Sequence, residues 1–251
     1  DFLYVNNRDG TFREVSQAAL RHTSRFSMGA DAGDIDGDGR TDFVVLDMLP
    51  RREAIRAVSG GEETRELAAL KRDLGYLPQV ARNTLQLNRG VGPDGAPRFS
   101  DVAYLAGVEA TDWSWSASLA DLDLDGRRDL FVTNGIWRRP NDLDFINYAS
   151  DAAVQRNIEA GVSEENLELL RRMPQVPVPN EAFRNVGAST GSARFEDVGA
   201  AWGLADESFS NGAATVDLDN DGDLDLVVNN VNSPAGVFEN QAADRGATSL
   251  S

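Results

Sequence analysis

The sequence contains no cysteine, one histidine and one lysine. The absence of cysteine excludes disulfides and thiolate metal sites, and a single histidine leaves a zinc centre without its usual ligands. Only 24 basic residues stand against 41 acidic ones, and the net charge of −17 argues against a nucleic-acid partner, because phosphates attract basic patches. The sequence also lacks an apolar run long enough to span a membrane.

What the sequence does contain is one acidic loop in three copies. They read DIDGDGRTD at 34–42, DLDLDGRRD at 121–129 and DLDNDGDLD at 217–225, with Asp at positions 1, 3, 5 and 9 and Gly at position 6. Alternate carboxylates on a tight turn converge on one point, and the Gly permits the bend. A single copy is explained equally well as a solvated acidic turn, but three copies with the same spacing favour a hard cation such as Ca²⁺.

About three Ca²⁺ ions are therefore predicted, one per loop, with carboxylate ligands at positions 1, 3, 5 and 9 and a backbone carbonyl at position 7. The predicted ligands are Asp34, Asp36, Asp38, Arg40 and Asp42; Asp121, Asp123, Asp125, Arg127 and Asp129; and Asp217, Asp219, Asp221, Asp223 and Asp225. Arg40, Arg127 and Asp223 are the carbonyl ligands. No other cofactor is expected, and most of the negative charge belongs to these metal sites.

The loops are not EF-hands, because an EF-hand needs a Glu at position 12 and a helix on each side. Position 12 is Val45, Val132 or Val228, and each loop runs into a short, β-branched segment typical of a buried strand. Each loop is therefore predicted to join two strands.

The repeat is longer than the loop. Phe12, Phe99 and Phe195 each lie 22 residues before the first Asp of a loop, and small residues precede every loop. Four antiparallel strands per repeat are typical of a propeller blade, and a first strand of Gly, Ser and Ala suits the crowded position nearest the axis. The four strands of the first complete repeat are expected at about 27–34, 42–47, 84–88 and 98–103.

Three short sequence motifs resemble those of a known family. They are F-S-x-G-A, the Asp loop followed by Phe or Leu, and a strand that ends in Asn, as in LQLN and VFEN. They resemble FG-GAP (VCBS) repeats, the units of integrin-α-like propellers, over roughly 1–48, 82–136 and 181–240. The wording around DLDNDGDLDLVVNN is similar to the cartilage acidic protein group, whose bacterial relatives carry an ASPIC/UnbV domain that is not visible here. The resemblance implies a calcium-stabilised, extracytoplasmic propeller.

The predicted fold is all-β: a partial β-propeller of four-stranded antiparallel blades, two full blades plus parts of two more, with two helical insertions. Residues 1–251 are expected to form one domain and to be a segment of a longer chain, because propellers need about four to eight blades to close. The insertions are expected at 49–81 and 137–181, each between the second and third strands of a blade.

The insertions are predicted to be helical. Leu67, Leu70 and Leu74 have helical spacing in the first, and Ser163 is a predicted helix start in the second. In an antiparallel meander the first and second turns lie at opposite ends, so the metal loops and the insertions are expected on opposite faces. The shared helical crown is either a face that binds a partner or a cap that packs its leucines on the blade edges.

No catalytic residues are predicted. His22 lies in a turn without a Ser or Cys nucleophile arrangement, and the clustered carboxylates are already assigned to metal. Trp113 and Trp115 point to one side of a strand, where packing is favoured over stacking on a sugar ring. Four residues at strand ends are interpreted as turn-forming: Asn6, Asn88, Asn185 and Asn240.

The predicted function is therefore a binding or scaffold module and not an enzyme, with a protein or glycan ligand at the insertion face. Two alternatives stay open: an accessory or carbohydrate-binding domain of a polysaccharide-active enzyme, and a lectin-like domain that uses the insertion face. The expected location is extracytoplasmic (secreted, cell surface or periplasm), because extracellular modules bind Ca²⁺ at about 10⁻⁴–10⁻³ M and would stay empty in the cytosol.

Overall fold

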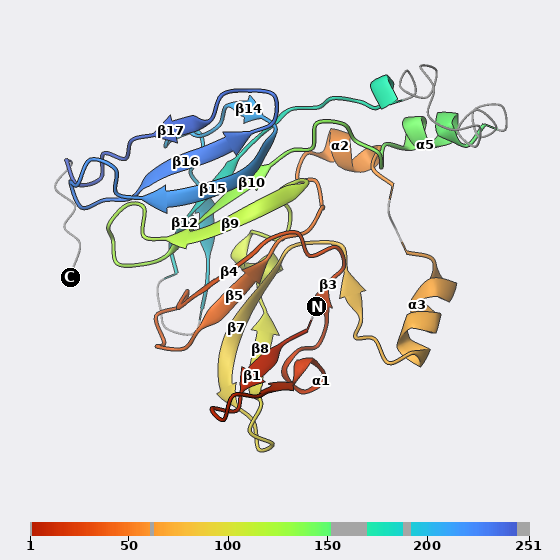
Figure 1. Cartoon of the computed structure of the whole chain (residues 1–251), viewed down its shortest axis with the longest axis vertical. Helices are drawn as coiled ribbons and strands as arrows, with labels where there is room; N and C mark the ends of the chain where they lie inside the picture. The colour runs from red at the N-terminus through yellow and green to blue at the C-terminus, as the bar shows by residue number, and fades with distance from the viewer. Residues whose placement is uncertain (1, 61–62, 152–169, 188–191, 245–251) are drawn as a thin grey trace.

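The computed structural model describes residues 2–60, 63–151, 170–187 and 192–244 (Figure 1). Within these ranges the chain consists mostly of short strands in several sheets, with few and short helices. All strand pairs in the described part are antiparallel except the short β3–β6 pair. The predicted all-β class is confirmed.

Two four-stranded antiparallel sheets form the centre of the molecule, and in both the strands lie side by side in chain order. The first sheet contains β4 (Ala30–Gly33), β5 (Asp42–Val45), β7 (Thr84–Val91) and β8 (Pro97–Asp101). The second contains β9 (Ser114–Ala120), β10 (Asp129–Asn134), β12 (Glu181–Asn185) and β13 (Phe195–Asp197). The four strands of the first sheet occupy the positions that the repeat predicts.

Further sheets lie on either side of this pair. The third sheet contains β15 (Ser210–Val216), β16 (Asp225–Asn230) and β17 (Gly236–Phe238). A hairpin of β1 (Tyr4–Asn6) and β2 (Phe12–Glu14) precedes the first sheet. Two short pairs are β3 (Thr23–Ser24) with β6 (Gln79–Val80), and β11 (Val178–Pro179) with β14 (Glu207–Ser208).

Each Asp loop joins the first and second strands of its sheet.

The longer helices lie between the second and third strands of the four-stranded sheets. These are α2 (Glu53–Ala57) and α3 (Arg65–Asp73) in the first sheet and α5 (Leu143–Ala149) in the second; α1 (Ser16–Ala19) and α4 (Ala103–Ala106) are single turns. Thr64 caps α3 by accepting the N–H of Leu67, and Asp142 caps α5 by accepting the N–H of Phe145. The helix start predicted at Ser163 lies outside the described residues.

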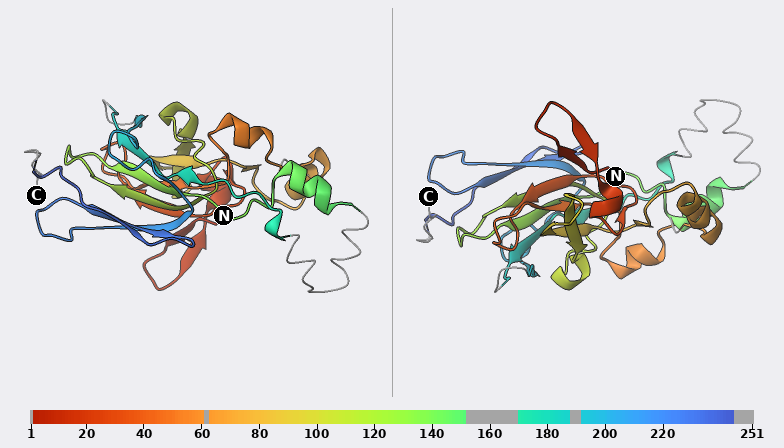
Figure 2. Two further views of the ribbon diagram at one scale, coloured as in Figure 1. Left: turned by 90° about the horizontal axis from the view of Figure 1, so that it is seen from above. Right: turned by 90° about the horizontal axis from the view of Figure 1, so that it is seen from below.

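The two insertions contact each other away from the Asp loops. The N–H of Gly60 donates to the carbonyl of Asn141 at 2.6 Å, and that of Leu143 donates to Val58 at 2.8 Å. Figure 1 shows α2, α3 and α5 on the right, whereas the β4–β5, β9–β10 and β15–β16 loops lie on the left. Both views in Figure 2 keep the helices on the side away from these loops.

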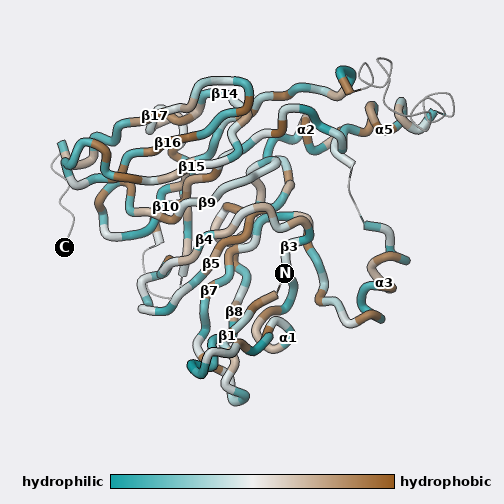
Figure 3. The backbone as a smooth tube through the Cα atoms, in the orientation of Figure 1, coloured by the Kyte–Doolittle hydropathy of each residue, from teal (hydrophilic) through white to brown (hydrophobic). Residues whose placement is uncertain are grey.

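The core lies between the sheets, and β10 contributes to two of its clusters because successive side chains of a strand point to opposite faces. Leu130 and Val132 pack with the buried residues of the first sheet, while Phe131 packs with Leu226 and Val228 of the third. All six residues of β10 are buried, which explains why its three apolar residues, Leu130, Phe131 and Val132, are consecutive. In Figure 3 the tube is brown along much of β5, which faces the same core.

The first strands of the sheets lie next to one another, with β9 between β4 and β15. Asp31 on β4 accepts the N–H of Leu119 on β9 at 2.7 Å. Just before β4, a Cβ added to Gly29 would lie 2.2 Å from the carbonyl oxygen of Trp115. This contact with the neighbouring backbone explains why the residue before β4 in the first repeat is glycine.

Gly29→Ala is therefore expected to destabilise the chain by about 1–3 kcal/mol or more, because the clashing atom belongs to the backbone and cannot move to another rotamer. Gly212 holds the same repeat position in the third sheet, where a Cβ meets no atom within 4 Å. Gly212→Ala is the matched control and should be nearly neutral in chemical denaturation. Equal losses in the two variants would contradict the packing of β9 against Gly29.

Candidate metal centre

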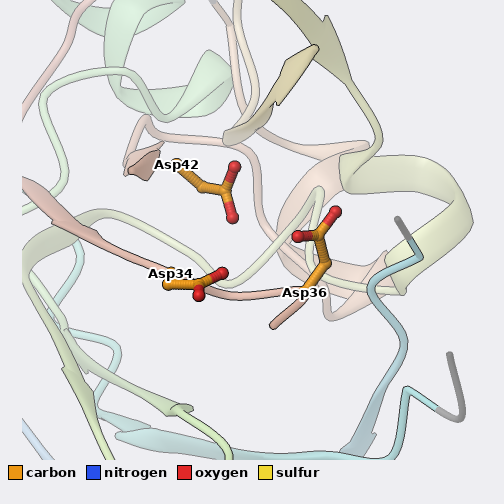
Figure 4. Close-up of side chains that lie close together, drawn as sticks. All are labelled: Asp34, Asp36 and Asp42. Carbon is orange, nitrogen blue, oxygen red and sulfur yellow. The ribbon is translucent and has the colours of Figure 1, made fainter. Parts of the chain in front are cut away.

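Each Asp loop gathers three carboxylates into one cluster, in which one oxygen of every member lies within 4.8 Å of the others. The clusters are Asp34, Asp36 and Asp42; Asp121, Asp123 and Asp129; and Asp217, Asp219 and Asp221. Figure 4 shows the first cluster, where the three carboxyl groups from the loop and the start of β5 lie around a common space. Nine of the predicted ligands are thus brought together in groups of three.

Position 9 of each loop ties the loop to its sheet. The carboxylate of Asp42 accepts the N–H of Ile35 at 2.8 Å and the N–H of Asn88 at 2.7 Å. Asp129 and Asp225 repeat both bonds in their own sheets, with donor–acceptor distances of 2.8–3.1 Å. These bonds fix the orientation of the carboxylate at position 9, so the protein's own hydrogen bonds set the geometry of the turn.

Position 5 differs between the loops. Asp38 contacts the guanidinium of Arg40 in the first loop, and Asp125 pairs with Arg127 at 2.5 Å in the second. Both carboxylates therefore have an arginine partner and lie outside the clusters named above. The third loop has Asp223 in place of the arginine, and there the carboxylate at position 5 joins its cluster. The carbonyl ligands at position 7 remain predictions.

The environment of Asp36 favours a cation site over a solvated acidic turn. Its side chain is 0% exposed, and neither carboxylate oxygen has a hydrogen-bond partner. Arg89 Nη1 lies 3.9 Å from Asp36 Oδ2, beyond hydrogen-bond distance. Burial, followed by repulsion from Asp42 and Asp38, raises the pKa of Asp36. A buried carboxylate without hydrogen bonds is costly unless a cation compensates its charge, so these residues fit a bound Ca²⁺.

The second cluster has the same electrostatic character. Burial, with the neighbouring charge of Asp123, raises the pKa of Asp129 to about 7 against the hydrogen bond from the Asn185 N–H. Burial and the charge of Asp125 also raise the pKa of Asp123. Both carboxylates are thus destabilised in their charged form, which a divalent cation would reverse.

In the second and third sheets, the Asn at the end of the third strand joins a neighbouring sheet as well as forming a turn. Asn185 Oδ1 accepts the N–H of Gly187 at 3.0 Å, which is the predicted turn role. Its Nδ2 also donates to the carbonyl of Ile35 in the first Asp loop at 2.9 Å. Asn240 likewise donates to the carbonyl of Leu122 in the second loop at 2.7 Å. Sequence reasoning missed this second role, although the recurrence of Asn at the end of each third strand was a signal for it.

The remaining candidates form structural contacts. His22 Nε2 lies 2.7 Å from Asp101 Oδ2, and Arg82 pairs with the same oxygen at 2.7 Å. Burial raises the pKa of Asp101, but hydrogen bonds from His22, Ala103 and Arg82, among others, lower it to about 2. The rings of Trp113 and Trp115 stack on each other with centroids 6.4 Å apart.

A model of the FG-GAP-like repeat matches residues 1–45, which include the N-terminal hairpin, β4, the first Asp loop and β5. No curated protein matches the chain. No helix in the described part of the chain combines the length and the apolar character that crossing a bilayer requires. The match supports the resemblance to FG-GAP/VCBS repeats over residues 1–45, the part of the chain that contains the first Asp loop.

Proposed function

We propose that this chain is a calcium-binding part of an extracytoplasmic β-propeller that acts as a binding or scaffold module and not as an enzyme. Two complete four-stranded sheets, a three-stranded sheet and a hairpin support two full blades plus parts of two more. The small first strands at the centre support the same arrangement. A relationship to the cartilage acidic protein and ASPIC/UnbV group is part of this proposal.

The buried carboxylate of Asp36, which has no hydrogen-bond partner, is the observation that carries the calcium assignment. A bound Ca²⁺ would supply the positive charge that balances each cluster. Asp34, Asp36 and Asp42 would hold it in the first loop, and the N–H groups of Ile35 and Asn88 orient Asp42 toward it. Ca²⁺ is favoured over Mg²⁺ because Mg²⁺ demands a tight octahedron and keeps its waters. Weak calcium sites of this kind fill outside the cytosol, which supports the proposed location.

Recognition is assigned to the helical crown formed by the two insertions. Leu67, Leu70 and Leu74 are 42%, 54% and 68% exposed, and they recur along one side of α3 and its end. Brown and teal alternate along α3 in Figure 3, as expected for an amphipathic helix. The crown lies opposite the Asp loops, so calcium would support the recognition face through the rigidity of the sheets, without touching the protein or glycan ligand.

Asp36→Asn tests the calcium assignment directly. The neutral amide removes one ligand charge from the first cluster, so the intact chain should lose one calcium ion in isothermal titration after chelation. Glu196→Gln is the matched control, because its side chain is 59% exposed and lies outside the clusters. An Asp36→Asn chain that binds as many ions as the parent would show that the first loop is not a calcium site.

A further inference from the structure

The second Asp loop contains a cation supplied by the chain itself. Arg184 on β12 places Nε 2.5 Å from Asp123 Oδ2 and Nη2 3.1 Å from Asp125 Oδ2. Asp123 is one of the three clustered carboxylates, and Asp125 is the predicted ligand at position 5. The negative charge of Asp123, followed by contacts with Asp125, raises the pKa of Arg184. The guanidinium therefore neutralises part of the charge that a metal ion would otherwise balance.

The other two repeats carry no cation at this position. The residue before the Asn of the third strand is Leu87 in the first repeat and Glu239 in the third. Leu87 is 0% exposed and packs in the hydrophobic core, so it offers no charge to the first loop. Arg89 on the same strand lies 3.9 Å from Asp36 Oδ2, a longer contact than the 2.5 Å between Arg184 and Asp123. The third loop instead gains negative charge from Asp223 at position 7. The arginine at position 7 does not explain the difference, because the first and second loops both have one.

We propose that Arg184 is a tethered counter-ion that lowers the Ca²⁺ affinity of the second loop below that of the first and third. The inference rests on the proposed calcium function. Metal binding at the second loop has to displace the guanidinium from Asp123 and Asp125, and a cation on the same chain competes at high effective concentration. In the first loop Asp36 has no hydrogen bond to give up. The Arg184 side chain is 41% exposed, so it can move into solvent when it is displaced.

Unequal loops would give the chain a graded response to calcium. The first and third loops fill at lower calcium concentration, and the second fills only when calcium outcompetes Arg184. The second loop lies between the other two along the chain, and Asn240 donates a hydrogen bond to the Leu122 carbonyl within it. Calcium binding at the second loop is therefore the last step that rigidifies the junction between the second and third sheets.

The glycine at position 6 gives a separate probe for every loop. The N–H groups of Gly39 and Gly126 each donate to the carboxylate at position 1 of their loop at 2.9 Å, and Gly222 is the equivalent residue in the third loop. A calcium titration of the intact chain, followed through these amide resonances by NMR, yields one Kd per loop. Gly126 is expected to titrate at about tenfold higher calcium than Gly39, a difference of about 1.4 kcal/mol.

Arg184→Leu introduces leucine, which is the residue at the equivalent position of the first repeat (Leu87). It should lower the Gly126 midpoint about tenfold and leave the Gly39 and Gly222 midpoints unchanged, while Arg184→Lys keeps the cation and should retain weak binding. Arg194→Gln is the matched control, because its side chain is 72% exposed and pairs with Glu196. Arg184→Gln gives the same test if the leucine variant fails to fold.

The melting temperature without metal provides a second readout, which Arg184→Leu should lower although it raises the calcium affinity of the second loop. In EDTA, Arg184→Leu should melt at lower temperature than the parent, because Asp123 loses its counter-ion. Equal midpoints at the three glycines of the parent, or an unchanged Gly126 midpoint in Arg184→Leu, would overturn the inference and leave the calcium function intact. Glycine amides that do not respond to calcium in the parent or in any variant would overturn the calcium function and the inference with it.

Discussion

Removal of calcium is expected to lower the melting temperature of the chain more than any single substitution described here. A ligand that binds only the folded state adds about 2.7 kcal/mol per site when its concentration is 100 times its Kd. Three filled loops would therefore contribute about 8 kcal/mol, which corresponds to a shift on the order of 20 °C for a chain of this size. Without metal, the buried carboxylates of Asp36 and Asp129 repel their neighbours.

Calorimetric scans in calcium, in magnesium and in EDTA measure this effect. The scan in magnesium should resemble that in EDTA, because the loops suit a larger cation with more oxygen ligands. Asp125→Ala should lower the melting temperature in calcium and have a smaller effect in EDTA. Coincident melting curves in calcium and in EDTA would show that the loops act as turns and not as metal sites.

Asn185→Leu is expected to lower the free energy of unfolding by about 3 kcal/mol or more, the largest effect expected of a single side chain. Asn185 is 1% exposed, and it donates to the carbonyls of Ile35 and Arg128 and accepts from the N–H of Gly187. Leucine would leave these groups without a partner, and each buried unsatisfied group costs about 1–3 kcal/mol. The lost bond to Ile35 also removes a link between the first and second sheets.

Asn6→Leu is the matched control for this change. Asn6 holds the same position in the N-terminal hairpin, but it is exposed, and its Oδ1 accepts the N–H of Arg8 at 2.7 Å in the turn. Urea denaturation of both variants should show a large loss for Asn185→Leu and a small one for Asn6→Leu. Similar losses would mean that the Asn residues act only through their local turns.

Local sequence predicted the loops and strands well because both signals are short-range. The Asp spacing and Gly at position 6 define a tight turn, and the apolar segment that begins at Phe43 or Leu130 defines the strand that follows. The helical spacing of Leu67 and Leu70 likewise predicted a helix where α3 lies. These features depend on residues a few positions apart.

What the sequence could not show are the contacts between distant residues. Arg184 reaches Asp125 across 59 positions, and Asn185 reaches Ile35 across 150. Ligand spacing within a loop gives no warning that an arginine from another strand competes with the metal. Only the packing of β12 beside the second loop brings the guanidinium to the cluster. The contact of Arg184 with the second loop therefore becomes visible in the structure and not in the spacing of the loop residues.

The number of calcium ions bound per chain tests the central claim most directly. Isothermal titration of the chelated, intact chain, taken to saturation, should count three ions, one for each Asp loop. Circular dichroism of the same sample should show that the chelated chain retains its strands. A folded chain that binds no calcium would contradict the account.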